Sequence, residues 1–199
     1  MVIKMSEITV NQTNRGTGAG GANTTANGIK LENKTRNAYT SNFNKSKLIW
    51  ESGKSKLEEG SFNGDERKLI RAWGKAGFKQ WDMMNDFSKD MDDWMNRCLH
   101  GTKEPDDAFI DMISKVIYWI ECKAQRNGKG SVCEKLQTYT NKIRNFKERY
   151  PEYTIKYIYV LDPYFKEECP REIKYMIEDN IPIVWNDENF EETLMSVIA

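Results

Sequence analysis

The sequence is poor in the residues that several classes of functional site require. It has one histidine, His100, among 199 residues. Metal sites built from several histidines and histidine-based acid catalysis therefore lack the side chains that they need. The four cysteines, Cys98, Cys122, Cys133 and Cys169, contain no CxxC pair, so we expect neither a zinc site nor a disulfide framework. No apolar run approaches the roughly 20 residues that cross a bilayer.

The beginning of the chain also lacks a signal-peptide pattern. Residues 1–10 are short and mixed in character instead of forming a long apolar run. We therefore expect a cytoplasmic protein with reduced thiols and no membrane partner. A length of 199 residues and a hydrophobic fraction of 39% fit one folded domain with a sizeable core.

The formal net charge is zero, but the charges are unevenly distributed along the chain. Residues 1–56 carry nine basic and three acidic side chains, a balance of +6, and residues 123–149 carry eight and two, again +6. Residues 161–199 carry three and ten, a balance of −7. Two basic stretches and one acidic stretch are typical of a protein with a basic DNA-binding cleft and an acidic surface that keeps it soluble on the opposite side. Charge clusters on solvent-exposed faces give the same pattern.

The first half of the chain is expected to be mainly helical. Residues 1–28 form a Gly/Asn-rich, flexible lead-in, and the GxGxxG match at 16–21 lacks the flanking strand and helix of a dinucleotide site. Residues 45–58 and 65–99 have apolar side chains at roughly helical spacing.

Strand patterns begin near residue 105, so 105–199 is the expected sheet core of a single domain. Strands are predicted at 108–112, 116–122, 154–161 and 181–185, and helices at 132–149, 171–179 and 188–197. The run at 116–122 is almost continuously apolar, which fits a central strand covered on both faces. The order of these elements predicts an α/β protein with a mixed sheet flanked by helices.

A pair of acidic residues stands out if the first two of these strands form a hairpin. When Asp106 lies opposite Glu121, the turn centres between Ile113 and Ser114 and the strand lengths match. Opposed residues have Cβ atoms about 4.5–5.5 Å apart, and two carboxylates at that distance repel each other unless a cation lies between them. Mg²⁺, a hard ion that prefers oxygen ligands, is the expected occupant.

Strand alternation then places Lys123 and Gln125 on the same face as Glu121. Two metal ligands, a lysine ammonium and an amide are what phosphodiester hydrolysis requires, because the ion and the ammonium stabilise charge on the phosphate. Two alternatives remain: these side chains are ordinary surface residues at strand ends, or Asp107 takes the place of Asp106 if the turn is one residue longer.

The spacing of Pro105-Asp106 and Glu121-x-Lys123 resembles the PD-(D/E)XK motif of the restriction-endonuclease-like superfamily. The segments GAGGANT (18–24), NGIKLENKT (27–35), KAGFKQW (75–81) and GSVCEKLQT (130–138) are similar to small type II restriction endonucleases of bacteria and large algal viruses. The resemblance implies the restriction-endonuclease-like fold and Mg²⁺-dependent cleavage of double-stranded DNA at a short specific sequence. It also implies that Glu32 is a further catalytic acid and metal ligand, and that Cys133 stands where an acidic residue is usual.

A chain with one active site needs a second copy to cut both strands of a duplex, so we expect a twofold-symmetric homodimer. DNA phosphates are expected to contact basic residues of the lead-in and of the 132–149 helix, namely Arg15, Lys135, Lys142 and Arg144. That helix is also expected to direct Lys147 and Arg149 away from its apolar stripe. Two other functions remain: a repair or junction-resolving nuclease, and a non-catalytic DNA-binding protein of the same fold.

Overall fold

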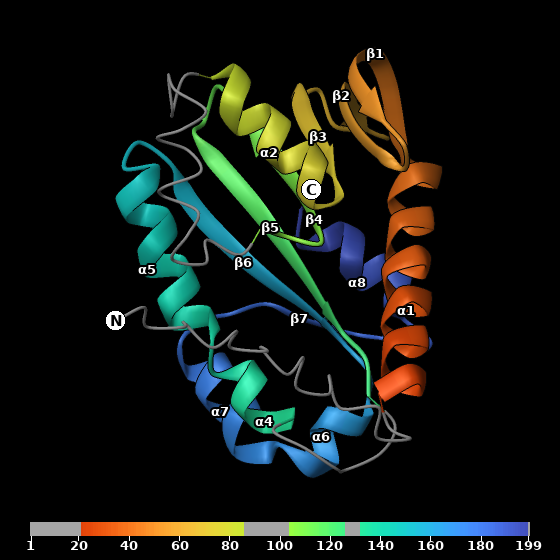
Figure 1. The fold of residues 1–199 in the computed structure, drawn as a ribbon, viewed down its shortest axis with the longest axis vertical. Coiled ribbons are helices and arrows are strands. Elements are labelled where there is room, and N and C mark those ends of the chain that lie inside the picture. Colours follow the sequence, from red (N-terminus) through yellow and green to blue (C-terminus); the bar gives the residue numbers. More distant parts are fainter. Residues whose placement is uncertain (1–20, 86–103, 126–131, 199) are drawn as a thin grey trace, which may run out of the picture.

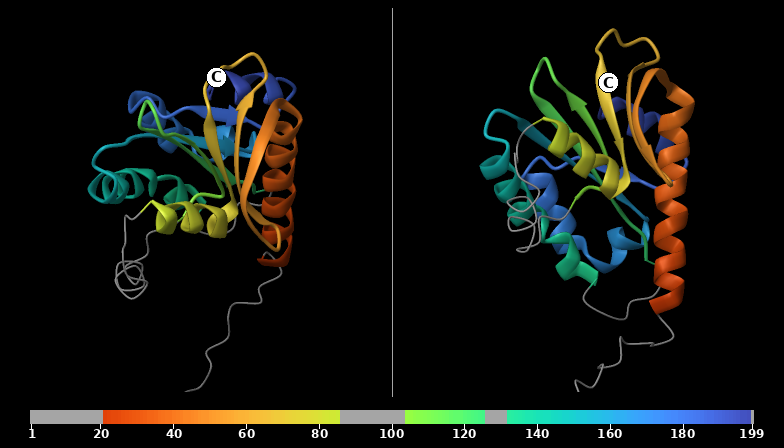
Figure 2. Two further views of the ribbon diagram at one scale, coloured as in Figure 1. Left: turned by 90° about the horizontal axis from the view of Figure 1, so that it is seen from above. Right: turned by 45° about the horizontal axis from the view of Figure 1, so that its top comes forward.

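The computed structural model describes residues 21–85, 104–125 and 132–198, in which a seven-stranded mixed sheet has helices on both faces (Figures 1 and 2). The strands are β1 (Phe43–Ser52), β2 (Ser55–Phe62), β3 (Leu69–Trp73), β4 (Asp107–Asp111), β5 (Val116–Lys123), β6 (Thr154–Leu161) and β7 (Ile183–Trp185). The helices are α1 (Gly21–Asn42), α2 (Gly74–Met84), α4 (Val132–Leu136), α5 (Tyr139–Arg149), α6 (Tyr164–Glu168), α7 (Pro170–Glu178) and α8 (Phe190–Ser196).

The strands lie in the sheet in the order in which they occur in the sequence. Each pair from β1 to β5 is antiparallel, whereas β5, β6 and β7 run parallel to one another. The parallel pair β5–β6 requires a crossover connection, and α4 and α5 supply it. The central strand β5 is buried along most of its length, as its apolar run predicts.

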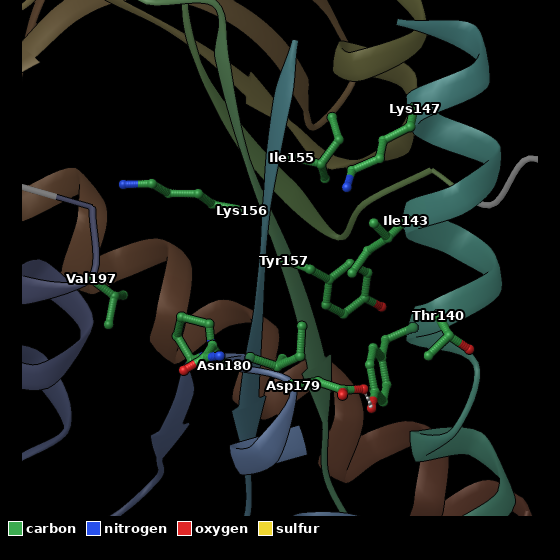
Figure 3. Close-up of a pocket in the computed structure, with 12 residues that line it drawn as sticks. Thr140, Ile143, Lys147, Ile155, Lys156, Tyr157, Asp179, Asn180 and Val197 are labelled. Carbon is green, nitrogen blue, oxygen red and sulfur yellow. Dashed lines mark hydrogen bonds between the residues drawn. The ribbon is translucent and has the colours of Figure 1, made fainter. Parts of the chain in front are cut away.

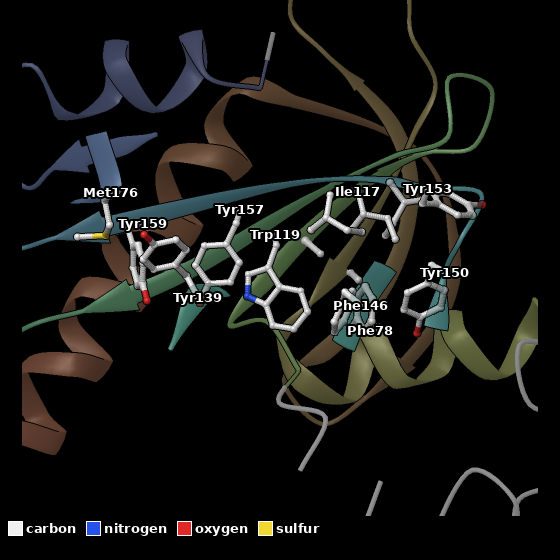
Figure 4. Packing of buried hydrophobic residues seen from close by; sticks show 14 of the residues in the cluster. Phe78, Ile117, Trp119, Tyr139, Phe146, Tyr150, Tyr153, Tyr157, Tyr159 and Met176 are labelled. Atoms are coloured by element: carbon white, nitrogen blue, oxygen red, sulfur yellow. The ribbon is translucent and has the colours of Figure 1, made fainter. Parts of the chain in front are cut away.

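Side chains that alternate along the central strands fill two separate cores. Trp119 and Tyr157 lie in a core that also contains Phe78 of α2 and Phe146 of α5 (Figure 4). Tyr118 and its neighbours on the opposite face belong to a second core, which is covered by α1 and α8. The two faces therefore have different helical covers: α2, α4, α5 and α7 on one face, and α1 and α8 on the other.

The β4–β5 hairpin has the register that counting predicted. Asp107 pairs with Ile120, and the pairing continues residue by residue to Asp111 and Val116. The Asp111 carboxylate accepts hydrogen bonds of 2.9 and 2.8 Å from the N–H groups of the two residues at the turn centre, Ile113 and Ser114. These bonds hold a short turn in place, and the turn fixes which residues face each other at the other end of the hairpin.

Several predicted elements are confirmed. The strand at 154–161 has the predicted bounds, and those at 108–112, 116–122 and 181–185 are found with shifts of one or two residues. The predicted helices at 171–179 and 188–197 correspond to α7 and α8. The helix predicted at 132–149 is divided into α4 and α5, and the short α6 has no counterpart among the predictions.

The helices predicted at 45–58 and 65–99 are wrong for most of the described residues in those ranges, where α2 is the one helix. Residues 45–58 form β1 and the start of β2. Because β1 is an edge strand with mostly exposed residues, its sequence has no clear apolar alternation. The range 65–99 contains β3 before α2, and Gly74, with a φ of +66°, marks the change from strand to helix. Residues 21–28 belong to α1 and not to a flexible lead-in.

The expectation of four reduced cysteines is also wrong, because Cys133 and Cys169 form a disulfide that joins α4 to the start of α7. Their separation of 36 residues gave no sequence signal. Cys122 is free and buried, whereas Cys98 lies outside the described residues. In the described ranges, no helix has the length and apolar character that crossing a bilayer requires.

Candidate functional site

Three of the five predicted catalytic residues, Asp106, Glu121 and Lys123, meet where β4 begins and β5 ends. Asp106 directly precedes β4, and its N–H donates a 3.1 Å hydrogen bond to the carbonyl of Ile120. Strand alternation places Asp106, Glu121 and Lys123 on the face that α2, α4 and α5 cover. A cavity of about 420 Å³ opens there, lined by Lys75, Glu104, Asp106, Glu121, Lys123, Lys135, Thr138 and Lys142.

Asp106 is held by the backbone of the opposite strand. Its carboxylate accepts a 2.9 Å hydrogen bond from the N–H of Cys122. Burial raises the pKa of Asp106, and the nearby Glu121 carboxylate raises it further, against the opposing effect of Lys123. The two acids therefore repel each other across the hairpin, as the predicted pairing requires.

Glu121 is the most heavily engaged acid of the site. It is 5% exposed, and its Oε1 atom accepts from both Lys123 and Lys142, with the Lys142 Nζ at 2.8 Å. Its Oε2 atom is 3.4 Å from the indole N–H of Trp119. Burial raises the pKa of Glu121, but the two ammonium groups outweigh burial and lower the pKa below its ordinary value. Glu121 is therefore ionised, and the ammonium groups of Lys123 and Lys142 stabilise its charge.

Lys142 occupies a position that differs from the prediction. It was expected on the exposed side of its helix, but it is 8% exposed and lies inside the cavity. Its ammonium also lies 3.1 Å from the hydroxyl of Tyr157. Burial lowers its pKa, partly against the effect of Glu121. The signal for this position was present in the sequence, because Lys142 lies three residues after Tyr139 and four before Phe146 on the apolar stripe of α5.

Asp107 has a different role from its neighbour. Its side chain points to the opposite face of the sheet, where Oδ2 lies 3.5 Å from Arg36 Nε on α1 and 3.8 Å from Arg71 Nη2 on β3. Its Oδ1 atom accepts from the N–H of Gly74 at 3.3 Å. Burial raises the pKa of Asp107 against both arginines. Asp107 therefore connects α1 to the sheet, and Asp106 is the acid that lines the cavity.

Glu32 approaches the site from α1, on the other side of the sheet. Burial raises its pKa, and the Asp106 carboxylate raises it further, while Arg36, Lys75 and Lys123 act in the opposite direction. Among the described residues, one group of three candidate ligands has its ligand atoms all within 4.8 Å of one another, and it lies elsewhere. Glu32, Asp106 and Glu121 therefore do not form such a group. In this conformation Glu32 is close enough to Asp106 for their charges to interact, but the three acids do not form one compact set of ligands.

Gln125 follows the end of β5 and is buried at 7% exposure. It is absent from the described residues that line the cavity, although alternation places it on the same face as Glu121 and Lys123. Lys75, Glu104 and Thr138, which do line it, were not predicted as site residues. Lys75 belongs to one of the segments that carry the family resemblance, whereas nothing in the sequence singled out Glu104 or Thr138.

The predicted DNA contacts have different environments. Lys135 is exposed at the rim of the cavity, and Arg144 is exposed on α5. Arg149, expected to face solvent, instead pairs with the buried carboxylate of Asp82. Arg15 lies outside the described residues. The exposed basic positions are therefore Lys135 and Arg144, with Lys147 beside them.

A larger cavity of about 600 Å³ lies between α5, β6 and the segment before β7 (Figure 3). Its one carboxylate, Asp179, accepts a 2.5 Å hydrogen bond from the hydroxyl of Tyr139. The remaining lining side chains are largely apolar, with Lys147 and Lys156 at its margin. The larger cavity thus lacks paired acids, so the smaller one contains the chemically competent set.

The group of three candidate ligands mentioned above consists of Cys133, Cys169 and Glu172. Because the two sulfur atoms are joined to each other, they are not thiolates that could bind a metal ion. Within the described residues, the Asp106–Glu121 pair is therefore the better candidate for a cation.

Comparisons with known proteins identify no relative. No family model matches the chain, and neither the curated proteins nor the solved structures contain a match.

Proposed function

We propose that the protein is a Mg²⁺-dependent endonuclease that hydrolyses phosphodiester bonds of double-stranded DNA. The observation that carries this proposal is the convergence of Asp106, Glu121 and Lys123 in one cavity at the end of the β4–β5 hairpin. Two acids and a lysine that line one cavity are the residue types that metal-assisted phosphate chemistry uses.

The donor set fits a hard divalent cation. Asp106 and Glu121 offer carboxylate oxygens, the ligands that Mg²⁺ prefers, and each affects the other electrostatically. The described residues that line the cavity include neither a histidine nor a free cysteine, the ligands that would favour a softer metal ion. When bound between these carboxylates, Mg²⁺ would polarise the scissile phosphate and lower the pKa of a bound water.

The protein residues would supply the remaining functions. Lys123, whose pKa is raised by Glu121 and Asp106 in spite of burial, remains an ammonium that can orient water or neutralise charge on the phosphate. Glu32 is proposed to position water near Asp106. Gln125 is proposed to support the end of β5, and Lys135 and Arg144 to contact phosphates, which position DNA without specifying sequence.

The finer assignment, a homodimeric type II restriction endonuclease of the restriction-endonuclease-like fold, rests on the resemblance in residues 18–35, 75–81 and 130–138. The α/β architecture and the mixed sheet are compatible with it. Recognition of a specific sequence would require contacts to base edges in addition to phosphates.

Plasmid cleavage tests the proposal. The protein is incubated with supercoiled plasmid and Mg²⁺, with EDTA as the metal-free control, and we expect discrete fragments that require Mg²⁺. Lys123→Ala should abolish cleavage and preserve the fold, whereas Lys156→Ala, at an exposed lysine outside the site cavity, should cut normally. Full activity of Lys123→Ala would refute the role of that lysine.

The product pattern separates the other two functions. Nicks confined to branched or damaged DNA would indicate a junction-resolving or repair nuclease. Unimpaired DNA binding without any cleavage would indicate a non-catalytic DNA-binding protein.

A further inference from the structure

Lys142 engages the same oxygen of Glu121 as Lys123 does. Its Nζ lies 2.8 Å from Oε1, and it comes from a different element, helix α5. The other oxygen, Oε2, faces the indole N–H of Trp119. Both oxygens of the central acid are thus already paired with donors from the protein. Oε2 keeps a lone pair beside this long contact, whereas Oε1 already accepts from two ammonium groups. A cation that binds Oε1 must therefore replace one of those two groups.

The Lys142 ammonium is fixed in this place by a second contact. The hydroxyl of Tyr157 lies 3.1 Å from Nζ, and Tyr157 is itself immobilised at 1% exposure, stacked on Trp119 with ring centroids 5.7 Å apart. Lys123, by contrast, has a side chain that is 28% exposed, against 9% for Lys142. Lys142 is the better anchored of the two ammonium groups.

The four charged groups around Glu121, that acid included, also balance one another without a metal ion. Two carboxylates, Asp106 and Glu121, face two ammonium groups, Lys123 and Lys142. A divalent ion added to this set meets Lys142 as a like charge in a partly buried environment, where charges are weakly screened. Removal of the Lys142 charge should therefore strengthen binding of the divalent ion.

We propose that Lys142 is a built-in cation that neutralises Glu121 in the metal-free protein and competes with the divalent ion for Glu121 Oε1. This inference rests on the proposed function, since it concerns the same metal site. Lys142 is accordingly a positioning residue that sets the metal concentration at which the site fills. It differs from the DNA-contact role that its sequence position suggests.

The test measures metal binding without DNA and without turnover. Mn²⁺ is titrated into the full-length protein, and the free ion is followed by electron paramagnetic resonance. Lys142→Met and Lys142→Gln remove the charge, and each should bind Mn²⁺ at least about tenfold more tightly than wild type, since a nearby unit charge in a partly buried site is worth at least that factor. Lys142→Arg keeps the charge and should stay within about threefold of wild type.

Lys147→Met is the matched control, because Lys147 is an exposed lysine of the same helix outside the site cavity, and its Mn²⁺ affinity should not change. Near-ultraviolet circular dichroism establishes that each variant is folded; the two neutral variants give independent measurements should one of them fold poorly. Unchanged affinity in both neutral variants overturns the inference, as does an equal gain in Lys142→Arg.

The result is separable from that of the proposed function. If wild type cuts plasmid with Mg²⁺ while the neutral variants gain no affinity, only the competition by Lys142 is refuted. If no variant binds Mn²⁺ and wild type does not cut, the metal-dependent nuclease is refuted together with it.

Discussion

The carboxylate of Asp106 accepts a 2.9 Å hydrogen bond from the main-chain N–H of Cys122, the residue between Glu121 and Lys123. A proposed metal ligand is thereby fixed by the backbone of the strand that carries the other proposed catalytic residues, Glu121 and Lys123. The bond does not depend on the side chain of Cys122, which faces the second core. The middle residue of the Glu-x-Lys sequence therefore fixes Asp106 through its main-chain N–H.

Replacing Asp106 separates this structural contact from the proposed catalysis. Asp106→Asn keeps an oxygen that can accept from Cys122 but loses the charge, so the fold should persist while Mg²⁺-dependent cleavage falls by about 10²–10³-fold. Asp106→Ala also loses the acceptor and should unfold more readily than the Asn variant by about 1 kcal/mol. Cleavage rates and urea unfolding check both; a rate within threefold of wild type in Asp106→Asn would contradict the assigned role.

Arg149 is expected to affect stability and not DNA binding. It pairs with Asp82, whose side chain is 2% exposed, and the hydroxyl of Tyr150 donates to the same carboxylate at 2.5 Å. Arg149→Met removes the guanidinium from this buried carboxylate and should lower the free energy of unfolding by about 3 kcal/mol. Urea unfolding measures this, with Arg144→Met on the same helix as a control that should change by less than about 0.5 kcal/mol. Equal stability of the two variants would show that the buried pair contributes nothing.

Lys135 and Arg144 are expected to contribute to DNA affinity through phosphates. Each loss of a phosphate contact should weaken binding to all duplexes alike and reduce the slope of log K against log salt concentration by about 0.9. Fluorescence anisotropy of a labelled duplex in EDTA checks Lys135→Met and Arg144→Met without cleavage. A slope equal to that of wild type in both variants would exclude them from the DNA interface.

Asp65 should make stability depend on pH. Hydrogen bonds from Arg67 lower its pKa below the ordinary value of 3.8, and Arg67 also donates to the Tyr118 hydroxyl and to the carbonyl of Ile198, each at 2.9 Å. An acid whose pKa is lower in the folded state stabilises the fold above its ordinary pKa, and this contribution disappears as the pH falls through the lowered value.

Asp65→Asn should therefore cost about 1 kcal/mol at pH 7, and its difference from wild type should shrink as the pH falls below 3.8. Urea unfolding at a series of pH values measures both stabilities. A difference that stays constant from pH 7 to pH 3 would contradict the lowered pKa.

The central strands could be predicted from the sequence because their burial on both faces is visible as apolar runs. The register of the β4–β5 hairpin followed from counting, since a short turn leaves little freedom in pairing. The edge strand β1 was missed because most of its side chains face solvent and so have no alternating pattern. A strand of that kind is specified by its neighbour β2 more than by its own residues.

The candidate site was predictable to the extent that it is local. Asp106, Glu121 and Lys123 belong to one hairpin, and their proximity follows from strand geometry. The burial of Lys142 depends on packing of α5 against β5 and β6, and lysine is normally exposed. The bond between Cys133 and Cys169 likewise depends on where α4 meets α7. Spacing places Lys142 on the apolar stripe of α5, but its contact with Glu121, like the disulfide, requires the tertiary arrangement.

The turn at Ile113 and Ser114 lies at the far end of the hairpin from the cavity, yet it determines which acid enters it. Inserting one residue there would shift the pairing of β4 with β5 by one position. The side chains at the start of β4 would then point to the opposite faces of the sheet. Asp107, with its two arginine partners, would then be turned toward the lysines, and Asp106 toward α1. Evolutionary or engineered changes in loop length at this remote point are thus as consequential as replacement of an acid in the cavity itself.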